Sequence, residues 1–265
     1  MEARNNMNYR QRPEANYSSL KILVDGTPAD YQHALKNPIV ATRPMEIGTI
    51  IHAIFLERKP FDTLAIVPPS DAPKRPSSVQ RNAKKPSAET LEAITFWDNF
   101  NPSGLIVLDR SEKQDVEHCV ESLMSSKWLA DVLADSDTEQ AVYGDVDGVA
   151  CKGLLDIVNR SQTLVVDLKC NSQDIGPDQF KWSVKKRLYD MQLALYSELL
   201  GVPQRPNWVW CVAQTTPPYL VALHKANDEH YSSGRAKLQT ALGKLKQCTE
   251  TGIWPGYPDR PIELP

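Results

Sequence analysis

The stretch GLLDIVNRSQTLVVDLKC, residues 153–170, decides the expected fold of this chain. It contains two mostly apolar runs on either side of the polar turn NRSQ at 159–162, a pattern that predicts two antiparallel strands joined by a short turn. The run LVVDLK is apolar, as a central buried strand should be, yet it contains an aspartate. An unpaired carboxylate in such a strand is costly, so this aspartate needs a partner or a function.

Two aspartates and a lysine are expected to meet across these two strands. Asp156 lies late in the first strand and Asp167 late in the next, so antiparallel pairing brings them close enough to share a cation. Asp167 and Lys169 are two residues apart, so their side chains point to the same face. The carboxylates can hold Mg²⁺ or Mn²⁺, while the lysine orients or deprotonates a water. The pattern favours phosphodiester hydrolysis, with a structural salt bridge as the alternative.

The elements on both sides of this hairpin predict an α/β fold. The turn signal GDVDG at 144–148 precedes the first strand, and apolar residues recur at helical or alternating spacing elsewhere. Strands interrupted by helices indicate a central mixed sheet with helices on its faces. We expect helices at 17–35 (two short ones, broken at Pro28), 44–57, 88–99, 111–134, 179–200 and 228–250, and strands at 139–143, 149–158, 164–168, 208–213 and 219–224.

Two segments do not have the pattern of packed elements. Residues 1–16 are polar and are expected to be frayed. Residues 68–88 are rich in Pro, Ser, Lys and Arg, which predicts a long mobile loop. This loop is either a solvated linker or a flap that contacts phosphates. Its basic residues are Lys74, Arg75, Arg81, Lys84 and Lys85.

Composition is that of an ordinary globular protein, with 41% hydrophobic and 24% charged residues among 265. We expect one domain over residues 1–265. The apolar runs are shorter than a membrane span and the N-terminus has no apolar signal region, so we expect a cytoplasmic protein without membrane contact. Five scattered cysteines without a CxxC pair suggest neither a zinc site nor an iron–sulfur cluster. The net charge of −3 argues against generic coating of DNA, although a local basic patch could still bind it.

Two further groups of residues agree with a site near the hairpin. His52 ends the helical stretch GTIIH that begins at Gly48, although a lone helix histidine is usually structural. Tyr189, Gln192 and Tyr196 are spaced three and four apart, which places them on one helix face. The alternative for this face is an ordinary amphipathic rim.

Taken together, these segments resemble the RecE-like (exonuclease VIII-type) branch of the PD-(D/E)xK nuclease superfamily, which is related to lambda exonuclease and the RecB nuclease domain. The resemblance follows the chain in order. Its motifs here are YSSLKILVDGTPADYQHAL, MEIGTIIHAIFLERKPFD, ACKGLLDIV, VVDLKC, YDMQLALYS and IWPGY. It implies a restriction-endonuclease-like core. Leu155 stands where the family often has arginine or proline, and Arg58 where it has proline; Lys152 could supply the missing charge.

The resemblance also implies roles for individual residues. His52, Asp156 and Asp167 become metal ligands, with the Leu168 carbonyl as a further one, and Lys169 becomes the catalytic lysine. The remaining positions are given catalytic or DNA-binding roles. Gln192 and Glu139 join the catalytic group, Glu57 matches a further acidic position, and Lys152, Tyr189, Gln192, Tyr196, Lys74, Arg75 and Arg81 are the expected DNA contacts.

The function implied by the resemblance is a 5′→3′ exonuclease that acts on linear double-stranded DNA and leaves a 3′ single-stranded tail. It implies Mg²⁺ (or Mn²⁺), a homo-oligomeric ring of three or four subunits, and a RecT-like single-strand annealing protein as partner. It also suggests a stand-alone phage or prophage gene product in the bacterial cytoplasm. A DNA endonuclease or a Cas4-like end-trimming nuclease is one alternative, and an inactive DNA-binding module is another.

Overall fold

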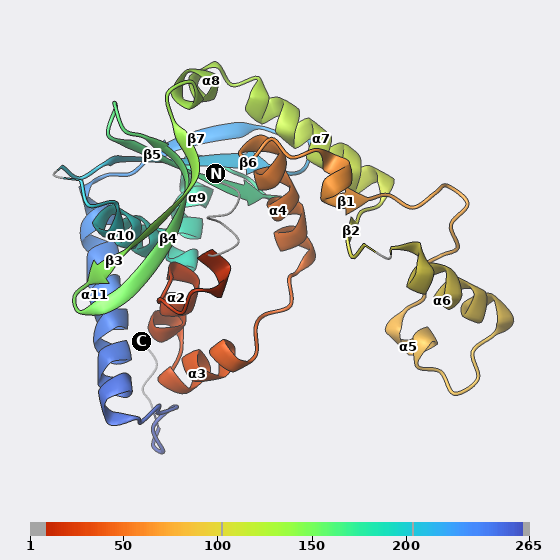
Figure 1. The fold of residues 1–265 in the computed structure, drawn as a ribbon, viewed down its shortest axis with the longest axis horizontal. Helices are drawn as coiled ribbons and strands as arrows, with labels where there is room; N and C mark the ends of the chain where they lie inside the picture. The colour runs from red at the N-terminus through yellow and green to blue at the C-terminus, as the bar shows by residue number, and fades with distance from the viewer. Residues whose placement is uncertain (1–8, 102, 203, 262–265) are drawn as a thin grey trace.

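The structure, a computed structural model, describes residues 9–101, 103–202 and 204–261. At its centre lies a five-stranded mixed sheet in the order β3 (Asp137–Val146), β4 (Val149–Asn159), β5 (Leu164–Asn171), β6 (Asn207–Gln214) and β7 (Val221–Lys225) (Figure 1). The strands β5 and β6 are parallel and the other neighbours are antiparallel. This sheet with its flanking helices confirms the predicted fold class.

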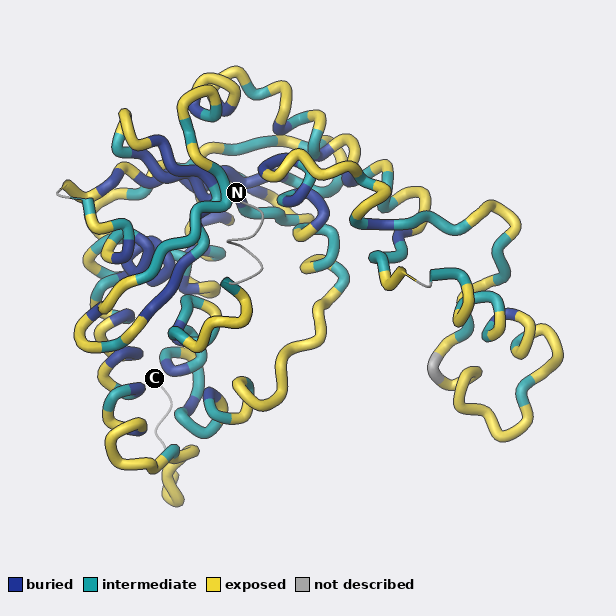
Figure 2. The backbone as a smooth tube through the Cα atoms, in the orientation of Figure 1, coloured by how far each residue is buried: buried dark blue, intermediate teal, exposed yellow. Residues whose placement is uncertain are grey.

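Helices cover both faces of the sheet because residues along β4, β5 and β6 alternate between two cores. One core contains Val165, Trp208 and Trp210, with residues of the helices α2 (Tyr17–Asp25), α3 (Pro28–Lys36), α9 (Pro177–Arg187), α10 (Tyr189–Leu200) and α11 (Asp228–Thr251). The other contains Val166 and Val209, with residues of α4 (Arg43–Phe55), α7 (Arg110–Met124) and α8 (Lys127–Leu133). Figure 2 shows this burial concentrated along the central strands.

Two of the long helices that the sequence predicts are each two helices. The break at Ser125 and Ser126 follows from capping, because the Ser126 side chain accepts a hydrogen bond from the Leu129 amide at the start of α8. The break at Leu188 has no such signal: Leu188 adopts a left-handed conformation, with φ of 58°, between α9 and α10. This joint turns α10 to lie along α11 and under the sheet.

The expected fraying of the N-terminus is wrong for residues 9–16, while residues 1–8 lie outside the described part. Ala15 bridges to Cys151, with hydrogen bonds from the Ala15 amide to the Ala150 carbonyl and from the Lys152 amide to the Ala15 carbonyl. The Lys152 ammonium also donates to the backbone carbonyls of Tyr9 and Arg12, at 2.7 and 2.5 Å. These bonds hold residues 9–16 against β4.

Residues 67–105 form an arm that extends away from the sheet (Figure 1). It follows a short 3-10 helix (Phe61–Thr63) and β1 (Ala65–Ile66), contains α5 (Ser78–Arg81) and α6 (Ala88–Phe100), and returns through β2 (Ile106–Val107), which pairs parallel with β1. The stretch at 68–88 was predicted to be a long loop, and the structure places the short helix α5 within it. Internal contacts shape it: the Trp97 indole donates to the Pro73 carbonyl at 2.9 Å, and Arg81 pairs with Asp98 at 2.7 Å.

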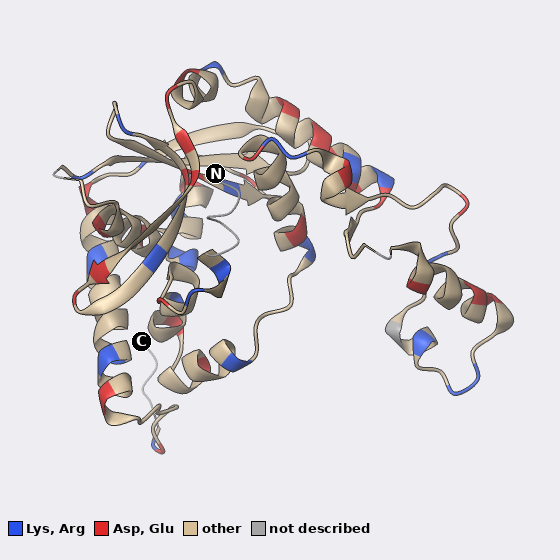
Figure 3. Cartoon of the chain, viewed as in Figure 1, with Lys and Arg blue, Asp and Glu red and all other residues tan. Residues whose placement is uncertain are grey.

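None of the helices in the described ranges is both long and apolar enough to cross a membrane. Residues of both charge signs are spread over the helices and the arm (Figure 3).

Candidate active site

Three acidic residues occupy one row across neighbouring strands. In the pairing of β3 with β4, Thr138 faces Ile157 and Gln140 faces Leu155, which places Glu139 opposite Asp156. In the pairing of β4 with β5, Ile157 faces Val166, so that Asp156 and Asp167 follow as the next opposite positions. The ladder is interrupted at these positions, and Glu139 has a positive φ of 51°. Three carboxylates thus gather where the strands separate.

The backbone of β5 supports one of these carboxylates directly. The Leu168 amide donates a hydrogen bond of 2.6 Å to Asp156 Oδ2, in place of the strand pairing that ends beside it. This contact confirms the expected neighbourhood of the two acidic strands.

His52 reaches the same row from α4. Its Nδ1 lies 3.9 Å from Asp156 Oδ1, and its side chain keeps 29% of its surface exposed. His52, Glu139 and Asp156 each offer one ligand atom, and these atoms all lie within 4.8 Å of one another. The histidine that sequence reasoning alone would treat as structural therefore belongs to a group of potential metal ligands.

Asp167 and Lys169 form the second half of the site, together with α10. Lys169 Nζ lies 2.7 Å from Asp167 Oδ2 and donates a 3.0 Å hydrogen bond to Gln192 Oε1. The Gln192 amide in turn donates to Asp167 Oδ1 at 3.1 Å. The ring centre of Tyr189 lies 4.6 Å from Lys169 Nζ. The ammonium is thus held by a carboxylate, an amide oxygen and an aromatic face.

Burial sets the protonation behaviour of this cluster. It raises the pKa of Asp156 and of Asp167 to about 6, against the opposing effect of the Lys169 charge. Burial, with added repulsion from Asp156 and Glu57, raises the pKa of Glu139 to about 8. Burial and the nearby Lys169 lower the pKa of His52 to about 4. The imidazole is therefore neutral at pH 7, the form that binds metals.

Lys169 keeps its charge despite burial. Desolvation lowers its pKa, but the charges of Asp167 and Asp156 and the hydrogen bond with Asp167 outweigh desolvation and hold the pKa above its ordinary value. The lysine therefore acts as a fixed cation at neutral pH.

The donor set fits a hard divalent cation. Crowded carboxylates with raised pKa values gain from a cation between them, and oxygen with imidazole nitrogen suits Mg²⁺ or Mn²⁺. Glu139 lies with His52 and Asp156 in the group of potential ligands. Asp167, which the sequence also predicts as a ligand, pairs with Lys169, which supplies its counter-charge. The Leu168 carbonyl lies beside this group: a hydrogen bond between the Leu168 backbone and His52 opposes the lowering of the His52 pKa by burial.

Several residues expected to contact DNA have other partners. Lys152 is only 3% exposed, and two backbone carbonyls of the N-terminal segment hold its ammonium. Gln192 and Tyr196 are buried at 7% and 6% exposure, which makes them supports of the site. Tyr196 packs on Gly153, where an added Cβ would lie 2.8 Å from the ring.

The expected basic contacts of the arm are not brought to the carboxylates. Lys74, Arg75 and Arg81 are exposed, and Arg81 is paired with Asp98. Arg75 lies over the Trp97 ring at 5.4 Å. These residues remain available to solvent on the arm.

Sequence reasoning underestimated Glu139, although a signal for it exists. With a two-residue turn at Asp147 and Gly148, both of positive φ, counting back along the hairpin places position 139 opposite 156. Tyr17 was also missed: its hydroxyl donates to the Arg187 carbonyl beside the site, and burial raises its pKa.

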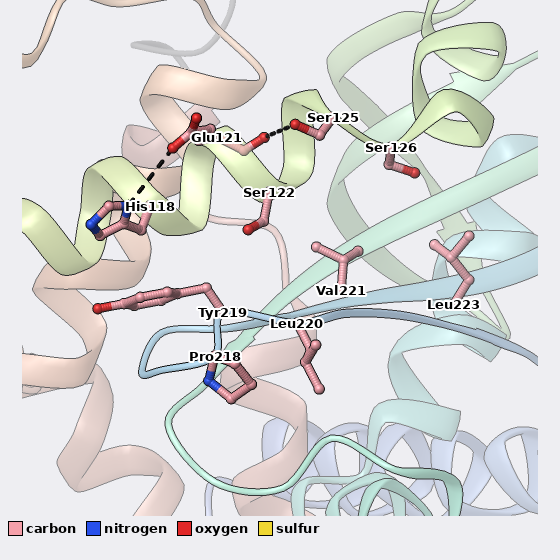
Figure 4. A pocket seen from close by; sticks show the side chains of 10 residues that line it. All are labelled: His118, Glu121, Ser122, Ser125, Ser126, Pro218, Tyr219, Leu220, Val221 and Leu223. Atoms are coloured by element: carbon pink, nitrogen blue, oxygen red, sulfur yellow. Dashed lines mark hydrogen bonds and ion pairs between the residues drawn. The ribbon is translucent and has the colours of Figure 1, made fainter.

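A cavity of about 590 Å³ lies elsewhere, between α7 and β7 (Figure 4). Its lining includes His118, Glu121, Tyr219 and Leu223, and it shares no residue with the carboxylate cluster.

The sheet, its acidic row and the lysine two residues beyond Asp167 define a fold of the PD-(D/E)xK type. A family model described as a PDDEXK-like domain of unknown function (DUF3799) matches residues 17–260. The protein belongs to this family. A comparison with curated proteins gives no match.

One solved structure supports the fold, and two others match with a lower structural similarity. The chain is similar to a candidate exonuclease from Eubacterium rectale, with a TM-score of 0.64 and 12% identity over 100% of this chain and 95% of that one. It also matches a phage-related exonuclease from Haemophilus somnus 129PT (TM-score 0.36, 16% identity, 69% of this chain and 92% of that one). A third match is SSO0001 (TM-score 0.31, 18% identity, 52% of this chain and 69% of that one).

Proposed function

We propose that this protein is a metal-dependent DNA exonuclease of the RecE-like type. The observation that carries the proposal is the convergence of His52, Glu139 and Asp156 beside the Asp167–Lys169 pair. A structural salt bridge alone would not need two further carboxylates and a neutral histidine at the same place, because crowding them costs free energy. The arrangement suits binding of a cation and a phosphodiester together.

The residues divide the work of hydrolysis between them. His52, Glu139 and Asp156, with Asp167 beside them, would hold the cation, which when bound polarises the phosphate and acidifies a water. Lys169 places a fixed positive charge where the phosphorane develops negative charge. Gln192 orients Lys169 and Asp167 relative to each other through its two hydrogen bonds. Tyr189 covers the lysine and limits access of bulk water to it.

The finer parts of the proposal rest on the resemblance described above. They are cleavage of linear duplex DNA from the 5′ end, Mg²⁺ as the natural cation, and a 3′ single-stranded tail as product. A homo-oligomeric ring of three or four subunits would keep an enzyme of net charge −3 on its substrate, because a ring can be basic inside and acidic outside. A RecT-like annealing protein in the bacterial cytoplasm would receive the tail.

Linear and circular duplex DNA test this function directly. We expect Mg²⁺-dependent degradation of linear DNA, no attack on closed circles, and earlier loss of a 5′ label than of a 3′ label. Cleavage of circles would favour the endonuclease alternative. Full activity in EDTA, or intact linear DNA with Mg²⁺ present, would contradict the proposal.

A further inference from the structure

Helix α9 carries an exposed aromatic and basic face that the proposed chemistry does not use. Trp182 is 65% exposed and is more exposed than any of the other five tryptophans, of which Trp208 and Trp210 are fully buried. An exposed indole can stack on a ligand, and here it lies among basic residues of the same helix. Lys181, Lys185 and Lys186 on the same helix are also exposed.

The two sides of α9 differ sharply. Phe180 and Val184, four residues apart, are buried, and Phe180 stacks on His224 at a ring distance of 4.6 Å. Trp182, Lys185 and Lys186 are spaced three and four apart, so they share the outer side. Lys185 Nζ lies 5.7 Å from the Trp182 ring centre. We call Trp182, Lys181, Lys185 and Lys186 the α9 face.

The α9 face lies next to the candidate active site in the chain and in space. β5 ends at Asn171, two residues past Lys169, and α9 begins six residues later. Tyr189, whose ring covers Lys169, follows the end of α9 after the single residue Leu188. Trp182 is five residues before the last residue of α9, or about 8 Å along the axis at ~1.5 Å per residue. A strand that runs from Lys169 past Tyr189 and along the outer side of α9 would reach Trp182.

We propose that the α9 face binds single-stranded DNA beside the scissile bond, with a base stacked on Trp182 and phosphates paired with the lysines. This inference rests on the proposed nuclease function and names the strand-binding element. Aromatic stacking with nearby lysines is how proteins hold single strands without sequence preference. Duplex DNA does not fit an indole in this way, because its base faces are stacked inside.

A protein partner is a poorer match for the same surface. Lysine is depleted at protein interfaces, whereas three lysines surround Trp182 here. The chain as a whole carries a net charge of −3, so α9, with four basic residues and one acidic residue, is a local exception. Charge complementarity therefore favours a polyanion.

The test compares two lysine–tryptophan pairs on opposite faces of the sheet. Trp128 on α8 is 37% exposed and follows Lys127, so Trp128→Ala is a matched control for Trp182→Ala. The probe is a fluorescein-labelled oligothymidylate, with a blunt duplex beside it, and affinity is read by fluorescence anisotropy in EDTA so that no cleavage occurs. Circular dichroism melting checks that each variant is folded.

We expect Trp182→Ala to weaken oligothymidylate binding roughly 5- to 100-fold, the range for removal of one base stack, with a smaller effect on the blunt duplex. Trp182→Phe should retain most of the affinity, because a phenyl ring also stacks. The double variant K185Q/K186Q should lower the log–log salt slope by about 1.4, since each phosphate that a lysine neutralises on a single strand contributes ~0.7. Trp128→Ala should match the wild type.

Several outcomes would overturn the inference. They are absence of oligothymidylate binding by the wild type, equal affinity of Trp182→Ala and Trp128→Ala, and loss of self-association in Trp182→Ala, which would make the face a protein contact. The nuclease proposal is judged separately, by cleavage of linear DNA with Mg²⁺. Trp182-dependent binding without cleavage would retain the α9 face and reject the nuclease, and cleavage without Trp182-dependent binding would do the reverse.

Discussion

The centre of the sheet and the arm at 67–105 both carry charged residues that the sequence marked as functional, but the fold uses them in different ways. At the sheet, three strands and the helix α4 bring five ionisable side chains together, and burial contributes to the shifts of their pKa values. On the arm, the basic residues stay exposed, and Arg81 is neutralised locally by Asp98. The sheet can therefore perform chemistry, while the arm can at most add affinity.

The strongest test of this contrast removes the carboxylates. Asp156→Asn and Asp167→Asn keep the shape of the side chains but remove negative charge from the sheet. We expect each to reduce cleavage of linear duplex DNA by at least about 10³-fold, because metal binding and lysine positioning both depend on them. Release of acid-soluble nucleotides measures the loss. Activity within ten-fold of the wild type would show that the acidic row is structural.

The next largest effect is expected from the lysine. Lys169→Ala should lower the cleavage rate by about 10²-fold or more while DNA binding is retained, since one fixed charge at the transition state has this value. Rates at saturating DNA, beside dissociation constants in EDTA, separate the two contributions. An unchanged rate would remove Lys169 from the mechanism.

Glu139→Gln sharpens the comparison inside the site, because it separates two sets of metal ligands. We expect cleavage to fall about 10- to 100-fold, as for loss of a group that supports a metal site. In the wild type, Mn²⁺ at about 100 times its dissociation constant should raise the melting temperature by roughly 5–10 °C. Glu139→Gln should reduce this gain. If Mn²⁺ raises the melting temperature of Glu139→Gln as much as that of the wild type but does not raise that of Asp167→Asn, then Asp167 rather than Glu139 is the metal ligand.

The smallest effect is expected on the arm. Replacing Lys74, Arg75, Lys84 and Lys85 by glutamine should leave the cleavage rate at saturating DNA unchanged, because none of them reaches the carboxylates. If the arm binds duplex phosphates, the salt slope of DNA binding falls by about 0.9 for each phosphate that the variant no longer neutralises. Binding measured over a series of salt concentrations decides this, and Arg81→Gln is the control because Arg81 already pairs with Asp98. An unchanged slope would make the arm a plain linker.

The sequence predicted the sheet and half of the site because the relevant signals are local. The apolar run at 164–168 and the turns beside it fix β4 and β5, and with them the proximity of Asp156 to Asp167. The left-handed joint at Leu188 was not predictable, because leucine carries no turn signal and the apolar pattern continues through it.

Other features depend on contacts between distant segments. Lys152 looks like a free cation in the sequence, yet its ammonium binds carbonyls about 140 residues away. The same contacts hold residues 9–16 against β4. Neither has a counterpart in local composition, so the sequence pattern could not indicate them.

The close packing of α10 has a consequence for how variants of this protein should be interpreted. A Cβ at Gly234 would lie 2.0 Å from the Asp190 carbonyl, and one at Gly153 would lie 2.8 Å from the Tyr196 ring. Both glycines pack closely against α10, the helix that carries Gln192. In a mutational scan scored by activity, these two positions should therefore group with the active-site residues, although neither glycine has a side chain that could take part in the reaction.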